Sequence, residues 1–120
     1  MITQLTDFPD NVAAFRCTGQ VTKEDYTKIL APAVLGKLQT HERVRVYYEI
    51  AEDFSGFDPA AMWEDFKVGV GHLTRWDKVA VVTDIDWIGN AVRFFSFLIP
   101  ATTRLFTLAE SAQARAWIST

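Results

Sequence analysis

The sequence predicts a single α/β domain over residues 1–120, built on a mostly parallel five-stranded sheet with an antiparallel strand at its N-terminal edge. Two observations carry this prediction. A chain of 120 residues with 49% apolar and 22% charged side chains has the size and composition of one globular domain. Along this chain, strand-like and helix-like segments follow in the order β-β-α-β-α-β-α-β-α, and such alternation is typical of parallel strands joined by right-handed crossovers.

A hairpin opens the chain. Residues 2–7 and 12–18 have the composition of short strands, and Gly19 ends the second. The tetrapeptide Phe8-Pro9-Asp10-Asn11 between them is typical of a tight turn with proline at its second position. So short a connection predicts that these two strands are antiparallel.

A helix and a strand come next. Thr22 is an N-cap with Asp25 at capping-box spacing, and apolar side chains recur at helical intervals as far as Leu38. Pro32 is expected to kink this helix, because proline donates no hydrogen bond to the preceding turn. Residues 43–50 alternate strictly between two faces, which predicts a half-exposed strand toward the sheet edge or on a thinly covered face.

Three helices and two strands complete the chain. Residues 58–75 are predicted to form a helix that starts with Asp-Pro, a strong N-terminal signal, and residues 86–99 are predicted to form another that stops before a proline. The continuous apolar run at 78–83 predicts a central strand covered on both faces. Residues 103–108 form the last strand and residues 109–118 the last helix.

Charge and composition exclude several classes of protein. Twelve basic against 15 acidic side chains give a net charge of −3, which argues against a nucleic-acid-binding protein. The single cysteine, Cys17, forms no intramolecular disulfide and no metal site alone. The N-terminus lacks the features of a signal peptide and no window of about 18 apolar residues exists, so we expect a cytoplasmic protein. The common phosphate-binding, nucleophile and metal-binding motifs are absent, so we expect no catalysis, no cofactor and no metal.

Four groups of short motifs follow one another over nearly the whole chain. They are Glu24-Asp25-Tyr26 with Leu30-Ala31-Pro32; Phe54-Ser55-Gly56-Phe57 ahead of Ala61-Met62-Trp63-Glu64-Asp65; residues 75–82 followed by Trp87; and Arg104-Leu105-Phe106 ahead of residues 110–117. In this order they resemble the SpoIIAA-like branch of the STAS superfamily, the sulfate transporter and anti-sigma factor antagonist domains. The resemblance implies a small STAS-like α/β domain without known catalysis. It also implies apolar ligand binding or membrane association, and a fold similar to the CRAL-TRIO lipid carriers.

The segment 87–99 is more apolar than packing on one sheet face requires. Its apolar side chains cover an arc of about 160° on a helix, whereas a stripe of about 100° suffices for packing. Three interpretations are open. The helix is buried between the sheet and a neighbouring element, or it forms the interface of a homodimer, or it serves as a movable lid over an apolar pocket or lies on a membrane surface. Because large apolar patches are rarely exposed on monomers, we expect a homodimer at micromolar concentration.

From the lid interpretation we predict a binding site for an apolar or lipid-like small molecule. The helix at 87–99 lines or covers this pocket, and the helix at 58–75 closes its other side. The predicted ligand-binding residues are Trp87, Phe94, Phe95, Leu98, Met62, Trp63 and Phe66.

A second candidate site lies in the loops that follow the strands. Ligands of parallel sheets bind beyond the carboxyl ends of the strands, where Glu52, Asp53, Ser55, Asp84 and Asp86 are expected. A magnesium or phosphoryl site is one interpretation, and acidic residues favoured by helix N-termini are the other. The resemblance implies that Ser55 corresponds to the serine that is phosphorylated in anti-sigma factor antagonists. The alternative is an ordinary turn serine.

Together these features predict a non-catalytic protein that binds an apolar or amphipathic small molecule, with membrane-surface contact through the 87–99 helix. The alternative is a regulatory protein-protein interaction module of the anti-sigma factor antagonist type, which docks a partner through Ser55 and the 52–58 loop. A cavity of hundreds of Å³ between helices and sheet distinguishes a carrier from a docking module.

Overall fold

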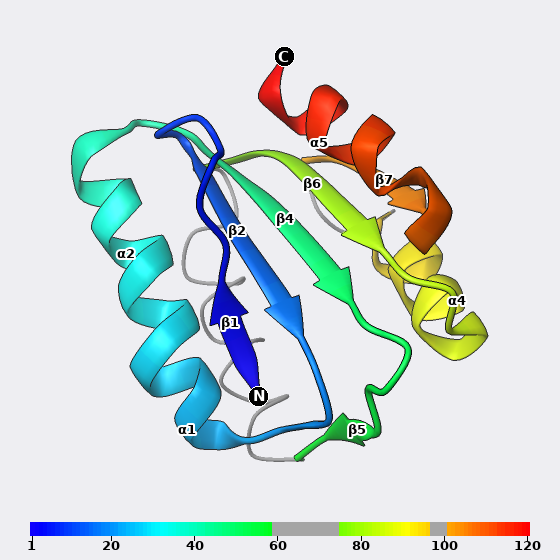
Figure 1. The fold of residues 1–120 in the computed structure, drawn as a ribbon. Helices are drawn as coiled ribbons and strands as arrows, with labels where there is room; N and C mark the ends of the chain where they lie inside the picture. Colours follow the sequence, from blue (N-terminus) through cyan, green and yellow to red (C-terminus); the bar gives the residue numbers. More distant parts are fainter. Residues whose placement is uncertain (59–74, 97–100) are drawn as a thin grey trace.

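The computed structural model describes residues 1–58, 75–96 and 101–120 and shows a twisted five-stranded sheet with helices against both faces (Figure 1). The strand order is β1-β2-β4-β6-β7. β1 runs antiparallel to β2, and the other neighbouring strands are parallel, so the predicted sheet is confirmed. The strands are β1 (Ile2–Gln4), β2 (Val12–Cys17), β4 (Val44–Ile50), β6 (Trp76–Val82) and β7 (Thr102–Phe106).

The core consists of two layers of side chains, one on each face of the sheet. Helix α2 (Ala31–Thr40) and helix α4 (Asp86–Phe95) pack on one face, and helix α5 (Ser111–Ser119) packs on the other. Neighbouring residues of β6 show the alternation, because Val81 is buried on the α2 and α4 side and Val82 on the α5 side. The prediction that this strand is covered on both faces is therefore confirmed.

The predicted capping box starts the first helical segment. The hydroxyl oxygen of Thr22 accepts a hydrogen bond from the Asp25 backbone N–H at 3.4 Å. A carboxylate oxygen of Asp25 accepts one from the Thr22 backbone N–H at 2.8 Å. These reciprocal bonds satisfy donors that a helix start leaves open, and the short helix α1 (Lys23–Asp25) begins there.

Pro32 coincides with a local change in helix geometry. A π-helical turn, Tyr26–Leu30, lies between α1 and α2, and the N–H of Ala31 donates to the carbonyl of Tyr26. That hydrogen bond reaches one residue further back than in an α-helix. It lies just before the proline, which has no N–H to donate, so the predicted irregularity takes the form of a π turn.

The strand at 44–50 lies in the middle of the sheet, and the expectation of a half-exposed strand near an edge is wrong. Val44 and Tyr47, which point to opposite faces, are each 0% exposed. Arg45 is also largely covered, since its guanidinium contacts a carboxylate oxygen of Asp77 and the carbonyl of Ile118, each at 2.9 Å. The alternating pattern shows only which side chains of this strand are polar. It does not show that α5, which is distant in the sequence, covers the polar face of the strand.

The remaining helices start close to the predicted positions. α4 begins at Asp86, and residues 97–100 after it lie outside the described chain. α5 begins after a 3-10 turn, Leu108–Glu110, where the sequence predicted a continuous helix. The helix predicted at 58–75 falls outside the described residues apart from its two ends. Among the helices that the structure describes, none combines the length and apolarity needed to cross a membrane.

Candidate functional site

The loops that follow β2 and β4 are joined at the carboxyl edge of the sheet. Two short strands, β3 (Gln20–Val21) and β5 (Gly56–Phe57), pair in parallel there, at the lower edge of the molecule in Figure 1. We name residues 51–58, which include β5, the strand-end loop. Three backbone hydrogen bonds tie this loop to the end of β2 and the chain after it: Ala51 N–H to Cys17 O (3.0 Å), Ser55 N–H to Gly19 O (2.9 Å) and Asp58 N–H to Val21 O (2.8 Å).

Ser55 is exposed on the strand-end loop although its backbone is held in place. Phe54 before it is only 8% exposed and belongs to the core on the α2 and α4 face. Gly56 after it has a φ of 145°, which residues with a side chain rarely adopt. A buried anchor on one side and a glycine-dependent bend on the other therefore leave the serine hydroxyl displayed to solvent.

An open groove of about 520 Å³ lies beside the strand-end loop, on the face of the sheet that α5 covers. Its polar lining residues are Arg16, Thr18, Glu49, Glu52, Asp53 and Ser111. Three carboxylates and one guanidinium give it a charged lining. Trp87 and Phe94, the two predicted pocket residues whose side chains the structure describes, do not line this groove.

Glu49 connects this groove to the core. One carboxylate oxygen accepts a hydrogen bond from the Tyr47 hydroxyl at 2.9 Å, and the other lies 3.4 Å from Nε of Arg16. The Tyr47 ring is buried, with its centroid 4.9 Å from that of Phe8. Burial first, and then the hydrogen bond and charge of Glu49, raise the pKa of Tyr47 to about 12. The phenol therefore stays protonated at physiological pH and donates to Glu49.

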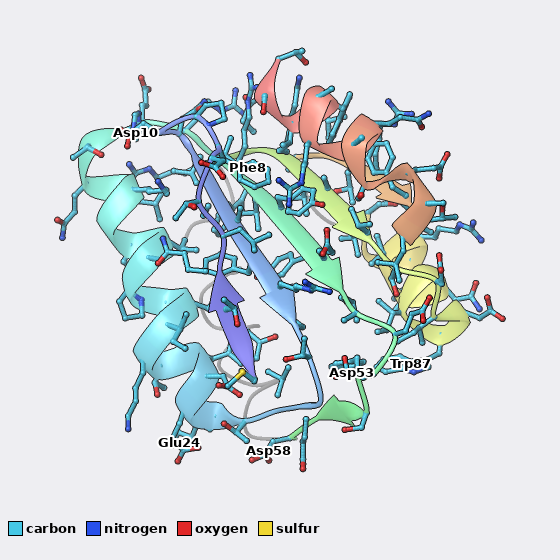
Figure 2. The ribbon with its side chains drawn as sticks, viewed as in Figure 1. Phe8, Asp10, Glu24, Asp53, Asp58 and Trp87 are labelled. Carbon is cyan, nitrogen blue, oxygen red and sulfur yellow. The ribbon has the colours of Figure 1, made fainter. Side chains whose placement is uncertain are left out.

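Exposed carboxylates border the same edge, and we name them the acidic rim: Glu52 and Asp53 after β4, and Asp84 and Asp86 after β6. Figure 2 shows Asp53 together with Asp58 at the lower edge of the molecule. Asp84 accepts a hydrogen bond from the backbone N–H that opens the turn before α5, at 3.0 Å. The described residues contain no group of three histidine, cysteine or acidic side chains that could hold a metal ion, so the rim lends no support to a magnesium site.

Helix α4 presents two aromatic side chains to solvent. Trp87 is 52% exposed and Phe94 is 65% exposed, whereas Ile88 on the opposite side of the helix is buried. The Trp87 ring centroid lies 6.4 Å from that of Phe54, so the start of α4 borders the strand-end loop. Gly89 permits close packing on β7, because a Cβ there would lie 3.1 Å from a leucine methyl group of that strand.

The predicted apolar pocket falls mostly outside the described structure. Trp87 and Phe94 are placed, and both face solvent. The pocket itself stays a prediction. Its remaining members are the side chain of Phe95, and residues Leu98, Met62, Trp63 and Phe66, all beyond the described part of the chain.

Sequence reasoning missed two features of this region. The pairing of β3 with β5 was not predicted, because strands of two residues are too short to show a periodic pattern. The one signal in the sequence was a pair of glycines, Gly19 and Gly56, and both have a positive φ in the structure. The contact between Glu49 and Tyr47 was also missed, although alternation on one strand places side chains two residues apart on the same face.

Comparisons with known proteins give a family and a fold. Residues 12–119 match the SpoIIAA-like family. The fold is similar to the crystal structure of an uncharacterised protein of the DUF3478 family, with a SpoIIAA-like fold, from Shewanella loihica PV-4. The TM-score is 0.77 at 21% sequence identity, over 98% of this chain and 93% of that chain. No curated protein matches the sequence. At this identity the structural likeness shows the fold and carries no activity across.

The raised pKa of Tyr47 predicts a distinct alkaline titration. In the folded protein the phenol of Tyr47 should ionise near pH 12, so Tyr47→Phe should remove one phenol from the absorbance change in that pH range. Unfolded tyrosine ionises near pH 10, so the free energy of unfolding contributed by Tyr47 is complete below pH 10 and is lost as the pH rises toward 12. Phenolate absorbance, with circular dichroism to confirm folding, measures this. An absorbance change near pH 12 that is the same in wild type and Tyr47→Phe would contradict the assignment.

Proposed function

Because the chain belongs to the SpoIIAA-like family, which it matches over residues 12–119, we propose that it is a regulatory module of the anti-sigma factor antagonist type. It acts by docking a partner protein on the strand-end loop. We propose no reaction for it.

The observation that carries the proposal is the combination of an exposed Ser55 hydroxyl with a fixed backbone. The Ser55 N–H donates to Gly19 at 2.9 Å, and Phe54 anchors the loop in the core. A docking surface that is already ordered loses less conformational entropy when the partner binds. An exposed hydroxyl on such a surface is also accessible to a protein kinase, so the same loop supports both docking and its control.

The charge of this edge suggests the chemistry of the partner. Glu52 and Asp53 are exposed on the strand-end loop, within three residues of Ser55. A partner with a basic patch matches this edge, and charge complementarity of this kind raises association rates and makes binding weaken with salt. Phosphorylation of Ser55 would add roughly 1.5–2 negative charges and three acceptor oxygens. That change alters both the charge and the shape of the surface that the partner contacts.

Charge reversal at Ser55 tests this function. We expect affinity capture from the cells that make the protein to recover the same partner with wild type and Ser55→Ala. Recovery should fall at least about tenfold with Ser55→Asp, because the new carboxylate alters the contact itself. Ser119→Asp is the matched control, since Ser119 is an exposed serine at the far end of α5. Equal capture by Ser55→Asp and Ser119→Asp would contradict docking on the strand-end loop.

Apolar ligand binding is the second candidate function, and the exposure of Trp87 and Phe94 on α4 favours it. Burying aromatic surface gains roughly 25 cal/mol per Å², enough for a fatty-acid chain to reach micromolar affinity after the costs of association. Membrane contact through α4 would draw on the same side chains.

A fluorescent fatty acid tests this second candidate. Saturable binding by the wild type is expected, weakened about tenfold or more by Trp87→Ala with Phe94→Ala. Leu35→Ala is the control, because Leu35 is a large apolar side chain 40% exposed on α2. The absence of saturable binding, or equal weakening by Leu35→Ala, would exclude α4 as the ligand site.

A further inference from the structure

Five exposed residues form one continuous stripe along α4: Asp86, Trp87, Asn90, Arg93 and Phe94. At about 100° per residue they span an arc of about 120° on the side of the helix away from the sheet. Among the described residues, neither the carboxylate of Asp86 nor the guanidinium of Arg93 has an ion-pair partner within the chain.

The stripe has two flanks that differ in chemistry. Asn90 lies on its midline, halfway along its length. The charged side chains Asp86 and Arg93 fall on one side of that midline, and the aromatic side chains Trp87 and Phe94 fall on the other. Each flank therefore has one residue near the start of the helix and one about two turns later.

This arrangement is complementary to itself. We propose that two copies of the chain associate through α4, with the two helices antiparallel and a two-fold axis at Asn90. A two-fold axis of this kind keeps each flank against the same flank of the partner and reverses the direction of the helix. Asp86 then meets Arg93 of the partner subunit, and Trp87 meets the partner's Phe94.

The alternative parallel arrangement of two α4 helices does not fit. It would place the charged flank of one helix against the aromatic flank of the other. It would also bring residues of equal number to the same height, so that neither Asp86 nor Arg93 would meet an opposite charge. Charge complementarity therefore favours a second copy of the chain, in antiparallel orientation, as the partner that binds this face of α4. A lipid or an unrelated protein would not be expected to match both charges of the stripe.

The size of the contact limits its strength. A helix of ten residues is about 15 Å long, and a pair of them gives an interface toward the lower end of the specific range. We therefore expect a dimer with a micromolar dissociation constant. The inference concerns assembly and does not rest on the function proposed for the strand-end loop.

Charge exchange across the axis is the decisive experiment. Sedimentation equilibrium of the wild type should show twice the 13.6 kDa chain mass at high micromolar concentration. Asp86→Arg or Arg93→Asp alone should weaken the dimer about tenfold, because each change places like charges opposite each other. The double variant should recover most of that loss, because it restores the pair with the charges exchanged.

Matched controls separate this contact from a general effect of charge. Glu24→Arg and Lys28→Asp reverse exposed charges on the first helical segment, and they should leave the dissociation constant unchanged. Circular dichroism confirms that each variant is folded. A wild type of single-chain mass throughout the micromolar range, or a double variant no stronger than the single variants, would overturn the proposal.

A cysteine at the axis gives an independent readout. At a helix separation of about 10 Å, the upper end of the usual range for packed helices, the two Cα atoms at position 90 lie about 5 Å apart, within disulfide reach. Asn90→Cys should therefore form a cross-linked dimer on mild oxidation, whereas Lys28→Cys should not. The native Cys17 is buried and does not compete. Equal cross-linking of the two variants would also overturn the proposal.

Discussion

Six consecutive residues of β2 pair in parallel with β4, from Val12 opposite Arg45 to Cys17 opposite Ile50. The position of the strand-end loop depends on this register. Because both strands end at the same edge, the segments that leave them run side by side and pair again as β3 and β5. That second pairing fixes the strand-end loop and leaves Ser55 exposed. A shift of one residue would turn the strand's side chains to the opposite face and displace the loop together with its serine.

The central position of β4 also connects the core to the surface. Tyr47 lies fully buried beneath α5, yet its hydroxyl bonds to Glu49, which lines the groove. On the other face, Phe54 belongs to the core and contacts Trp87 of α4. The strand-end loop therefore lies between a charged groove on the α5 face and the exposed stripe of α4. A partner on the loop and a second copy on α4 would be neighbours, which offers a route for one to affect the other.

The sequence predicted the sheet well, because periodicity, capping and turn signals agree in each main element. Thr22 with Asp25 and the apolar run of β6 depend on neighbours in the sequence, and the structure bears both out. The errors come from contacts that no local pattern encodes. β4 was expected near an edge, because Arg45 and Glu49 are charged, and only α5 explains how Arg45 is covered. The sequence identified Ser55 as a candidate site for partner docking. It did not predict the pairing of β3 with β5 that holds Ser55 in place, because strands of two residues show no periodic pattern.

Docking on the strand-end loop requires that the backbone around Ser55 is already fixed before any partner binds. Amide hydrogen exchange measured by nuclear magnetic resonance on the free protein tests it directly. We expect the Ser55 and Asp58 amides, bonded to Gly19 and Val21, to exchange slowly, as does the Ala51 amide bonded to Cys17 at the end of the main sheet. Protection at Ala51 with exchange at the rate of an unstructured chain at Ser55 and Asp58 would contradict it, because the loop would then have no fixed surface to present.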